Sequence, residues 1–358
     1  MYLTWPRVKG TILLRAGHSR EEEKALHVAA EILQKGGLVA FPTETVYGLG
    51  ANALDPEAVK GIFRVKRRPA DNPLIVHVTG LEQVGELVKN IPPEAARLAE
   101  HFWPGPLTLV LPKKELVPEI ITAGLSSVAV RVPAHALALK LLRTVGIPLA
   151  APSANLSGRP SPTTAEHVLE DLAGCIEAVL DGGPCTIGVE STVLSFLSSP
   201  PALLRPGGVT LEMLEEVSGK EIRDLSSGEK DLPSGAPLSP GMKYRHYAPR
   251  APLYLVEGEE PAQRRQLIAL CAGLAGQGYK IGLILFAESQ GLFPAPVVKV
   301  LSSRKDPHGA AERLFGVLRE MDVRDVDVIV VEGFDDKGMG KAVMNRLRKA
   351  AAKIIQAE

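Results

Sequence analysis

The sequence GGLVAFPTETVYGLGANALDPEAVKGIFRVKRRPADNPLIVHV, residues Gly36–Val78, contains three short elements and a basic run. Its apolar start, Leu38–Phe41, predicts a short buried strand, and the Thr- and Gly-rich residues that follow predict an open turn. Apolar residues then recur at helical spacing and lead to Lys66-Arg67-Arg68. Five basic residues and no acidic one lie from Lys60 to Arg68. Because open α/β sheets bind ligands at strand ends, this stretch predicts an anion site.

The pattern beyond this stretch predicts two α/β domains joined by a linker. Short apolar runs alternate with helical patterns through residues 1–218, which we interpret as the catalytic domain. Residues 219–252 form the predicted linker, rich in Gly, Ser and Pro, and its aromatic and basic end, Met242–Pro249, predicts docking over the active site. Residues 253–358 read as βαββαβα, the order of a small Rossmann-like sheet. This unit lacks a GxGxxG turn, so we do not expect it to bind a dinucleotide.

Composition limits the classes of function. Lys plus Arg and Asp plus Glu both number 41, so bulk charge does not indicate a protein that coats nucleic acid or membrane. The three cysteines, Cys175, Cys185 and Cys271, have no metal-like spacing, and we expect free buried thiols. No apolar stretch is long enough for a membrane span, and the N-terminus does not resemble a signal peptide. We therefore expect a cytoplasmic protein.

Two charged or titratable residues stand in apolar strand patterns. In Leu74–Val78 the alternation places His77 on the face opposite three apolar residues, which is typical of a core histidine or of a neutral hydrogen-bonding group in a site. In Val128–Val132 the alternation separates Arg131 from three valines. A buried arginine needs a partner, since an unpaired buried charge is very costly. That partner is either a carboxylate of the protein or one of a ligand.

The polar loop PSANLSG, Pro152–Gly158, follows an apolar run and precedes a capped helix, so it reads as a capped turn or as a second anion contact. The sequence has no GxxxxGK[ST] loop, no GxSxG elbow and no HExxH helix. A covalent nucleophile is therefore not expected, and the chemistry that remains is positioning with charge neutralisation.

Together, seven segments in this order resemble the YrdC-type threonylcarbamoyl-AMP synthases. They are PTETVYGLG (Pro42–Gly50), KRRPADNPLIVHV (Lys66–Val78), FWPGPLTLVL (Phe102–Leu111), VAVRVP (Val128–Pro133), APSANLSG (Ala151–Gly158), GVEST (Gly188–Thr192) and LRPG (Leu204–Gly207). The segment PGMKYRHYAP and the second α/β unit resemble the two-domain form of that family. The resemblance implies a twisted open mixed sheet around a positively charged cavity, plus a smaller Rossmann-like C-terminal domain.

The resemblance also implies an activity and two groups of binding residues. The activity is synthesis of L-threonylcarbamoyl-AMP from L-threonine, bicarbonate or CO2, and ATP, for N6-threonylcarbamoyladenosine beside the anticodon of tRNA. Residues implied to bind ATP are Lys66, Arg68, Asn72, Ser127, Ser153, Asn155, Ser161, Arg205 and Tyr247, of which Lys66 and Arg68 are implied to be catalytic. Residues implied to bind threonine are Thr45, His77, Arg131, the backbone of Ala151, and Ser191.

Mg²⁺ is expected to accompany ATP, and no metal site made of protein side chains is predicted. Expected partners are the three substrates, with the downstream tRNA threonylcarbamoyl transferase and a weak RNA contact left open. Two alternative functions remain at this point. An RNA-binding module would use the basic cavity for structured RNA. A carbamoyl transferase of hydrogenase maturation contains a related domain, but its zinc-finger-like cysteine motifs are missing from this sequence.

Overall fold

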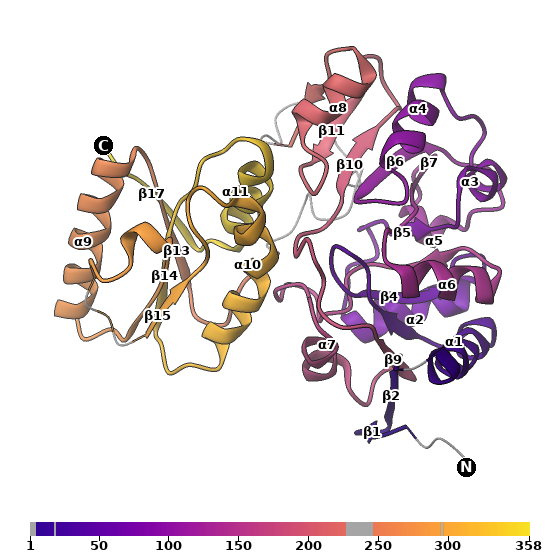
Figure 1. Cartoon of the computed structure of the whole chain (residues 1–358), viewed down its shortest axis with the longest axis horizontal. Coiled ribbons are helices and arrows are strands. Elements are labelled where there is room, and N and C mark those ends of the chain that lie inside the picture. Colours follow the sequence, from indigo (N-terminus) through magenta and orange to yellow (C-terminus); the bar gives the residue numbers. More distant parts are fainter. Residues whose placement is uncertain (1–4, 18, 227–245, 294, 296) are drawn as a thin grey trace. The chain divides into compact units, whose positions relative to one another are not determined.

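The computed structural model describes residues 5–17, 19–226, 246–293, 295 and 297–358. The chain divides into two compact units (Figure 1). The first comprises Met1–Ser157 and Ser161–Lys243, and the second comprises Gly158–Pro160 and Tyr244–Glu358. Part of the predicted linker, residues 227–245, lies outside the described residues. Among the described residues no helix is long and apolar enough to cross a membrane.

The first unit is built on a mixed sheet, which confirms the expected fold class. Among its described residues the strand order is β1-β2-β9-β3-β4-β8-β5-β7-β6-β10-β11-β12, with parallel and antiparallel neighbours. The strands are β1 Arg7–Val8, β2 Thr11–Arg15, β3 Val39–Phe41, β4 Gly48–Asn52, β5 Ile75–His77, β6 Leu107–Pro112, β7 Ser127–Arg131, β8 Leu149–Ala150, β9 Ala178–Asp181, β10 Thr192–Ser195, β11 Ala202–Arg205 and β12 Arg223–Asp224.

Helices pack on both faces of this sheet through separate apolar clusters. One cluster joins α1 and α6 to β3, and another joins α2, α3, α4 and α7 to the opposite face. The helices are α1 Ser19–Gln34, α2 Pro56–Lys66, α3 Leu81–Leu87, α4 Pro93–Phe102, α5 Glu119–Thr122, α6 Ala136–Val145, α7 Ala165–Leu172 and α8 Leu211–Ser218. The first unit is therefore three-layered, α/β/α, over the part of the sheet that α1 and α6 cover.

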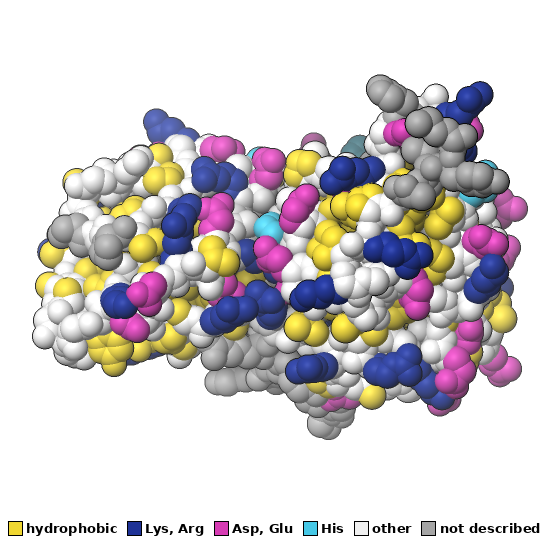
Figure 2. All heavy atoms as spheres, turned by 90° about the horizontal axis from the view of Figure 1, so that it is seen from below, with side chains coloured by type: hydrophobic (Ala, Val, Ile, Leu, Met, Phe, Trp, Pro, Cys, Tyr) yellow, Lys and Arg dark blue, Asp and Glu magenta, His cyan; other side chains and the backbone are white. Residues whose placement is uncertain are grey.

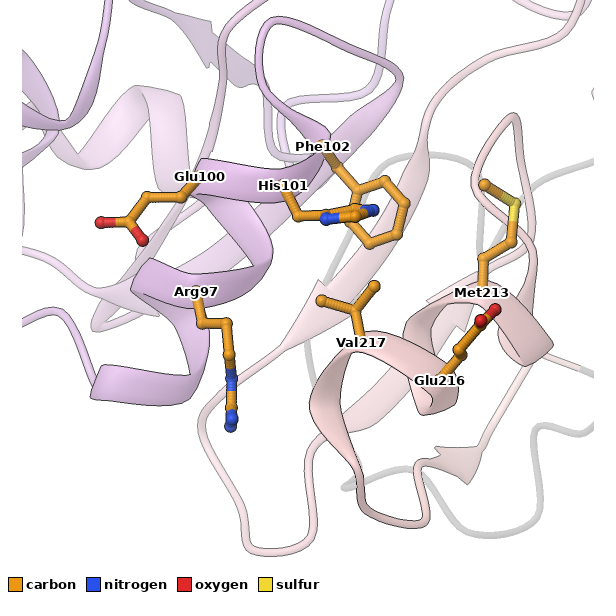
Figure 3. A pocket seen from close by; sticks show the side chains of 7 residues that line it. All are labelled: Arg97, Glu100, His101, Phe102, Met213, Glu216 and Val217. Atoms are coloured by element: carbon orange, nitrogen blue, oxygen red, sulfur yellow. The ribbon is translucent and has the colours of Figure 1, made fainter.

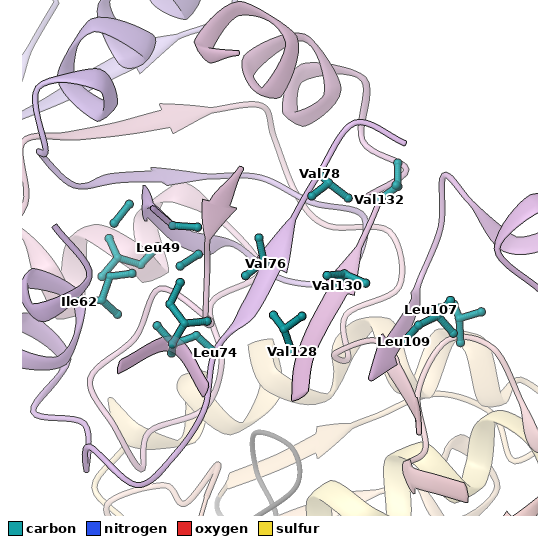
Figure 4. Packing of buried hydrophobic residues seen from close by; sticks show 14 of the residues in the cluster. Leu49, Ile62, Leu74, Val76, Val78, Leu107, Leu109, Val128, Val130 and Val132 are labelled. Carbon is teal, nitrogen blue, oxygen red and sulfur yellow. The ribbon is translucent and has the colours of Figure 1, made fainter. Parts of the chain in front are cut away.

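The predicted alternation along two neighbouring strands is confirmed. Alternate residues of β5 and β7 and of their flanking positions lie in the same large core cluster (Figure 4). They are Leu74, Val76, Val78, Val128, Val130 and Val132. Fully burying one such side chain contributes about 1.5–3 kcal/mol. The two strands are parallel, and their register pairs His77 with Arg131 on the other face. Apolar burial thus fixes the two polar residues side by side.

One element differs from the sequence prediction. The segment with Gly48 and Gly50, interpreted as an open turn, is the buried strand β4, which pairs antiparallel with β3 and β8. A Cβ on Gly50 would lie 2.9 Å from the ring of Phe41. The glycines therefore leave space for the Phe41 ring against the strand, and they do not end the strand. A glycine within a strand often marks such a close approach of another group to the backbone.

The second unit contains a parallel sheet of the Rossmann-like kind predicted. Its order among the described residues is β15-β14-β16-β13-β17. The elements are β13 Leu253–Glu257, α9 Glu260–Gly276, β14 Ile281–Leu285, β15 Val297–Val300, α10 Pro307–Asp322, β16 Val328–Glu332, α11 Gly338–Ala350 and β17 Lys353–Gln356. The last strand was missed, since its exposed KIIQ sequence is short and lies next to a basic helix.

Candidate active site

Lys66 connects the basic run to the Ser153–Asn155 loop. It is the last residue of α2, and only 1% of its surface is exposed. Its Nζ donates hydrogen bonds to the carbonyl oxygens of Ser153 and Asn155. The Oδ1 of Asn155 lies 3.4 Å from Nζ and accepts a hydrogen bond from Ser153 Oγ at 2.6 Å. Two segments far apart in the sequence thus form one buried polar cluster.

Arg68 lies on the loop that leads from α2 to β5. The helix ends at Lys66, earlier than predicted, because Arg67 adopts a left-handed conformation with φ 52°. The Arg68 side chain donates from Nε to Asn72 O at 3.1 Å and from Nη2 to Pro73 O at 2.9 Å. Asn72 is buried, and its Oδ1 has no hydrogen-bond partner among the described residues. The basic run therefore folds back on the loop instead of extending as a helix face.

The turn Thr43–Tyr47 ties several of the predicted segments together. The Tyr47 N–H donates to Pro162 O at 2.9 Å, and Tyr47 O accepts from Ala154 N at 2.8 Å. The Ile187 N–H donates to Glu44 O at 2.8 Å. Backbone hydrogen bonds thus hold this turn against the loop that contains Asn155, the residues around Ser161, and the segment before Ser191.

The partner of the buried Arg131 is a protein carboxylate that sequence reasoning missed. Arg131 Nη2 lies 2.7 Å from Glu44 Oε1, and both side chains are less than a tenth exposed. Arg131 also donates from Nη1 to Thr45 Oγ1 at 3.0 Å and from Nε to Gly105 O at 3.2 Å. Glu44 stands next to Thr45 in PTET, and this acidic residue in an otherwise apolar and hydroxylic turn was the signal that could have identified it.

His77 is buried beside this ion pair. Burial, and to a smaller extent the positive charge of Arg131, lowers the pKa of the His77 imidazole to about 3. The imidazole is therefore neutral near pH 7, as the sequence reading required. Its ring makes an edge contact with Phe41, and its Nδ1 has no hydrogen-bond partner among the described residues.

Ser191 and Arg205 meet directly, although the resemblance assigned them to different ligands. Arg205 donates from Nε to Ser191 O at 3.0 Å and from Nη2 to Ser191 Oγ at 3.2 Å. Thr108 Oγ1 lies 2.7 Å from Ser191 Oγ. A Cβ on Gly207 would lie 2.3 Å from Thr192 N, so only glycine allows these two loops to pack together. The two individually weak sequence signals GVEST and LRPG are thus parts of one contact.

The remaining predicted residues of the first unit, Ser127, Ala151 and Ser161, are also buried. Ser161 Oγ donates to Glu190 Oε1 at 2.5 Å. Ser127 begins β7, opposite Pro112 in the antiparallel register. The Ala151 N–H already donates to Ile75 O at 2.9 Å, so its carbonyl oxygen is the backbone group left to accept a hydrogen bond from a ligand.

Tyr247 is described within the second unit. Its ring centroid lies 5.2 Å from that of Phe315 and 5.9 Å from Arg346 Cζ, and only 5% of the residue is exposed. The role of Tyr247 as a cover of the nucleotide stays a prediction. The preceding residues Tyr244 and Arg245, which belong to the same predicted docking segment, lie outside the described residues.

The cysteines offer no nucleophile of ordinary reactivity in this site. Burial raises the pKa of the Cys185 thiol to about 12, so it stays protonated near pH 7. Burial also raises the pKa of Cys271, in the second unit. Cys175 is exposed, so the expectation that all three thiols are buried was wrong. It follows a short turn at the end of α7, where the chain reaches the surface before β9.

The described residues contain a pocket that lies apart from the predicted site residues. Among the described residues no group of three His, Cys, Asp or Glu side chains could hold a metal ion. A pocket of about 610 Å³ lies between α4 and α8, where Arg97, Phe102, Met213 and Val217 line it (Figure 3). None of the predicted site residues lines it. The positive charge of a cavity shared by all the predicted residues stays a prediction.

Two family models together match most of the chain. The model described as "Telomere recombination", of the Sua5, YciO and YrdC proteins, matches residues 31–207. The model described as "Threonylcarbamoyl-AMP synthase, C-terminal domain" matches residues 209–352.

Similar proteins include threonylcarbamoyl-AMP synthases from Pyrococcus abyssi and Bacillus subtilis. The first is 52% identical and covers 95% of this chain and 98% of its own length. The second is 49% identical and covers 90% of this chain and 92% of its own. The crystal structure of P. abyssi Sua5 complexed with L-threonine has a TM-score of 0.90 at 52% identity, covering 97% of this chain and 99% of that one. This chain therefore belongs to the Sua5/YrdC family of threonylcarbamoyl-AMP synthases, in its two-domain form.

Proposed function

We propose that the chain synthesises L-threonylcarbamoyl-AMP from L-threonine, bicarbonate (or CO2) and ATP, and releases pyrophosphate. One observation carries the proposal. The buried Arg131 donates to Thr45 beside the neutral His77, and a relative with half its residues identical has been crystallised with L-threonine. A guanidinium that already sits in a polar, dry environment is suited to a ligand carboxylate, because it grips two oxygens in a fixed plane.

In this proposal the threonine site lies at the ends of β5 and β7. Arg131 binds the amino acid's carboxylate, and the hydroxyls of Thr45 and Ser191 hydrogen-bond to its polar groups. Neutral His77 adds a hydrogen-bonding group without adding charge. The Ala151 carbonyl accepts a hydrogen bond from the substrate, since its N–H is used within the sheet.

The ATP site is proposed around the Lys66 cluster. The residues assigned to it are Lys66, Arg68, Asn72, Ser127, Ser153, Asn155, Ser161, Arg205 and Tyr247. The support is local: Lys66 already joins Ser153 and Asn155. On nucleotide binding, the Lys66 ammonium would donate to phosphate oxygens in place of the carbonyl oxygens that now accept from it.

The proposed chemistry has two steps. The α-ammonium of threonine first loses a proton to water, and the neutral amine then attacks the carbon of bicarbonate, forms the carbamate C–N bond and releases water. A carbamate oxygen then attacks the α-phosphorus of ATP in line, and the bond to pyrophosphate breaks. Two anions approach in this step, so Lys66, Arg68 and Arg205 would offset their repulsion and the charge on the leaving group.

Mg²⁺ would enter with ATP and neutralise charge on its phosphates. In this proposal the ion is bound chiefly through triphosphate oxygens, as is usual for Mg²⁺ that accompanies a nucleotide. The cytoplasm is the proposed location because the reaction uses ATP and serves tRNA. Transfer of the product to the downstream transferase, and a weak RNA contact, belong to the same proposal.

The test is release of pyrophosphate by the purified chain with ATP and bicarbonate, with and without L-threonine. The expected result is threonine-dependent release together with a product of the mass of threonylcarbamoyl-AMP. Release that is equal without threonine would refute the proposal. The RNA-binding alternative is disfavoured, since Lys and Arg side chains are interspersed with acidic ones on the face shown in Figure 2, and relatives that span nine-tenths of the chain carry the synthase name.

A further inference from the structure

Glu44 has an unused acceptor in the interior of the first unit. Only 6% of the residue is exposed, and its Oε1 lies 2.7 Å from Arg131 Nη2. Among the described residues no donor forms a hydrogen bond with Oε1 or with Oε2, so the contact of Oε1 with Arg131 is an ion pair and both oxygens can still accept a hydrogen bond. An ionised carboxylate can accept about four hydrogen bonds, and a buried carboxylate that accepts none of them costs free energy. An acceptor kept in this state is suited to a donor that arrives from outside the protein.

The groups that face Glu44 come from several elements, and Arg131 is the cation among them. The carboxylate raises the pKa values of His135 and Cys185, but burial dominates both groups: it lowers the pKa of His135 and raises that of Cys185. The His135 ring and the Cys185 thiol are therefore neutral near pH 7. Arg131 and Glu44 together carry no net charge, and His77 adds none.

A pair of opposite charges with open acceptors matches a zwitterion. The α-ammonium of a free amino acid lies next to its carboxylate, and it carries three donors. If the carboxylate binds Arg131, as the proposed function requires, the ammonium comes within the neighbourhood of Glu44, because Arg131 and Glu44 are in direct contact. In the complex Arg131 then pairs with the ligand carboxylate and Glu44 pairs with the ligand ammonium. None of the four charges is left unpaired.

We infer that Glu44 recognises the α-ammonium of L-threonine and thereby makes the site specific for amino acids over hydroxy acids. This inference rests on the proposed threonine site and adds a residue to it. Glu44 acts on the substrate directly, and it also orients Arg131. These two roles differ in one measurable respect: orientation of Arg131 affects every carboxylate ligand, whereas contact with the ammonium affects only ligands that have one.

The experiment compares two ligands on matched variants by isothermal calorimetry with the full chain. The ligands are L-threonine and 2,3-dihydroxybutanoate of the same configuration, in which a hydroxyl replaces the ammonium. We expect the wild-type chain to prefer threonine by about 10- to 100-fold, the range of one buried hydrogen bond to a charged group. In Glu44→Gln the preference should fall to within about threefold, mainly through weaker binding of threonine.

Controls separate the possible failures. Glu31→Gln removes an exposed carboxylate on α1 that pairs with Lys35, and it should leave both affinities unchanged. Glu44→Asp keeps the charge and should retain a preference for threonine. Equal weakening of both ligands in Glu44→Gln, or no change in either, overturns the inference.

If Glu44→Gln does not fold, the wild-type comparison can still overturn the inference, because equal affinity for the two ligands contradicts an ammonium contact. Absence of threonine binding in the wild-type chain would instead refute the proposed function. Competition by the hydroxy acid in the pyrophosphate assay gives an independent measure of the same preference.

Discussion

Replacement of Arg131 by alanine removes the cation at the centre of the proposed threonine site. Arg131 is 4% exposed and contacts Glu44, Thr45 and the Gly105 carbonyl. Truncating one partner of a buried, hydrogen-bonded charge pair costs about 2–5 kcal/mol of binding. The dissociation constant of L-threonine should therefore rise by at least about 30-fold. That of ATP should change much less, by about twofold, because none of the contacts of Arg131 is made with a residue assigned to ATP.

The same substitution also affects folding, and the structure predicts by how much. Without Arg131 the Glu44 carboxylate is left buried and uncompensated, which typically costs about 3–5 kcal/mol of the free energy of unfolding. The double variant Arg131→Ala with Glu44→Gln removes both charges. Its loss of stability should be smaller than the sum of the two single losses by about 0.5–3 kcal/mol.

Calorimetric titration with each substrate and urea unfolding of the four forms in the cycle measure both effects. Thr144→Ala, which removes a hydroxyl bonded to Lys140 O at the exposed end of α6, serves as a control for titration artefacts. If Arg131→Ala weakens threonine and ATP equally, the assignment of Arg131 to threonine is wrong. If the stability losses add, Glu44 and Arg131 are not energetically coupled.

Three further predictions concern the surroundings of the site. The pKa of His77 is lowered from 6.5 to about 3 in the folded chain, so the unfolded chain binds more protons in this interval. The free energy of unfolding should therefore decrease as pH falls below about 6.5, and urea titrations should show a shallower decrease in His77→Gln; identical pH profiles would contradict the burial argument. Gly207→Ala places a Cβ 2.3 Å from Thr192 N, and it should lower the free energy of unfolding by about 1–3 kcal/mol, measured by urea unfolding; an unchanged midpoint would mean that the two loops do not pack as described. Cys185→Ala should retain threonine-dependent pyrophosphate release, because burial keeps the thiol protonated; abolished turnover in a folded variant would show that the thiol takes part.

Much of the fold follows from local pattern. Alternation in Leu74–Val78 and Val128–Val132 separated His77 and Arg131 from the valines and leucine beside them, and the core cluster shows the same division. This worked because a strand has a period of two and one of its faces is apolar. The strand β4 was missed for the opposite reason. Its glycines suit a turn locally, and only the Phe41 ring across the sheet explains them.

The site residues divide in a similar way. In the fold, Lys66 contacts Ser153 and Asn155, and Arg205 contacts Ser191. The sequence motifs identify all five of these residues. The sequence also required that Arg131 have a buried partner, but left open whether the protein or a ligand supplies it.

Sequence by itself determined the α/β class and the presence of a second α/β domain, and it predicted a site for anions, because these depend on periodicity and on local chemistry. Only the tertiary structure decided that Glu44 is the partner of Arg131 and that its oxygens accept no hydrogen bond from the described residues. The two residues lie on different segments of the chain, and which charges meet in the interior depends on strand register and loop packing. Neither of these is encoded in any short stretch of sequence.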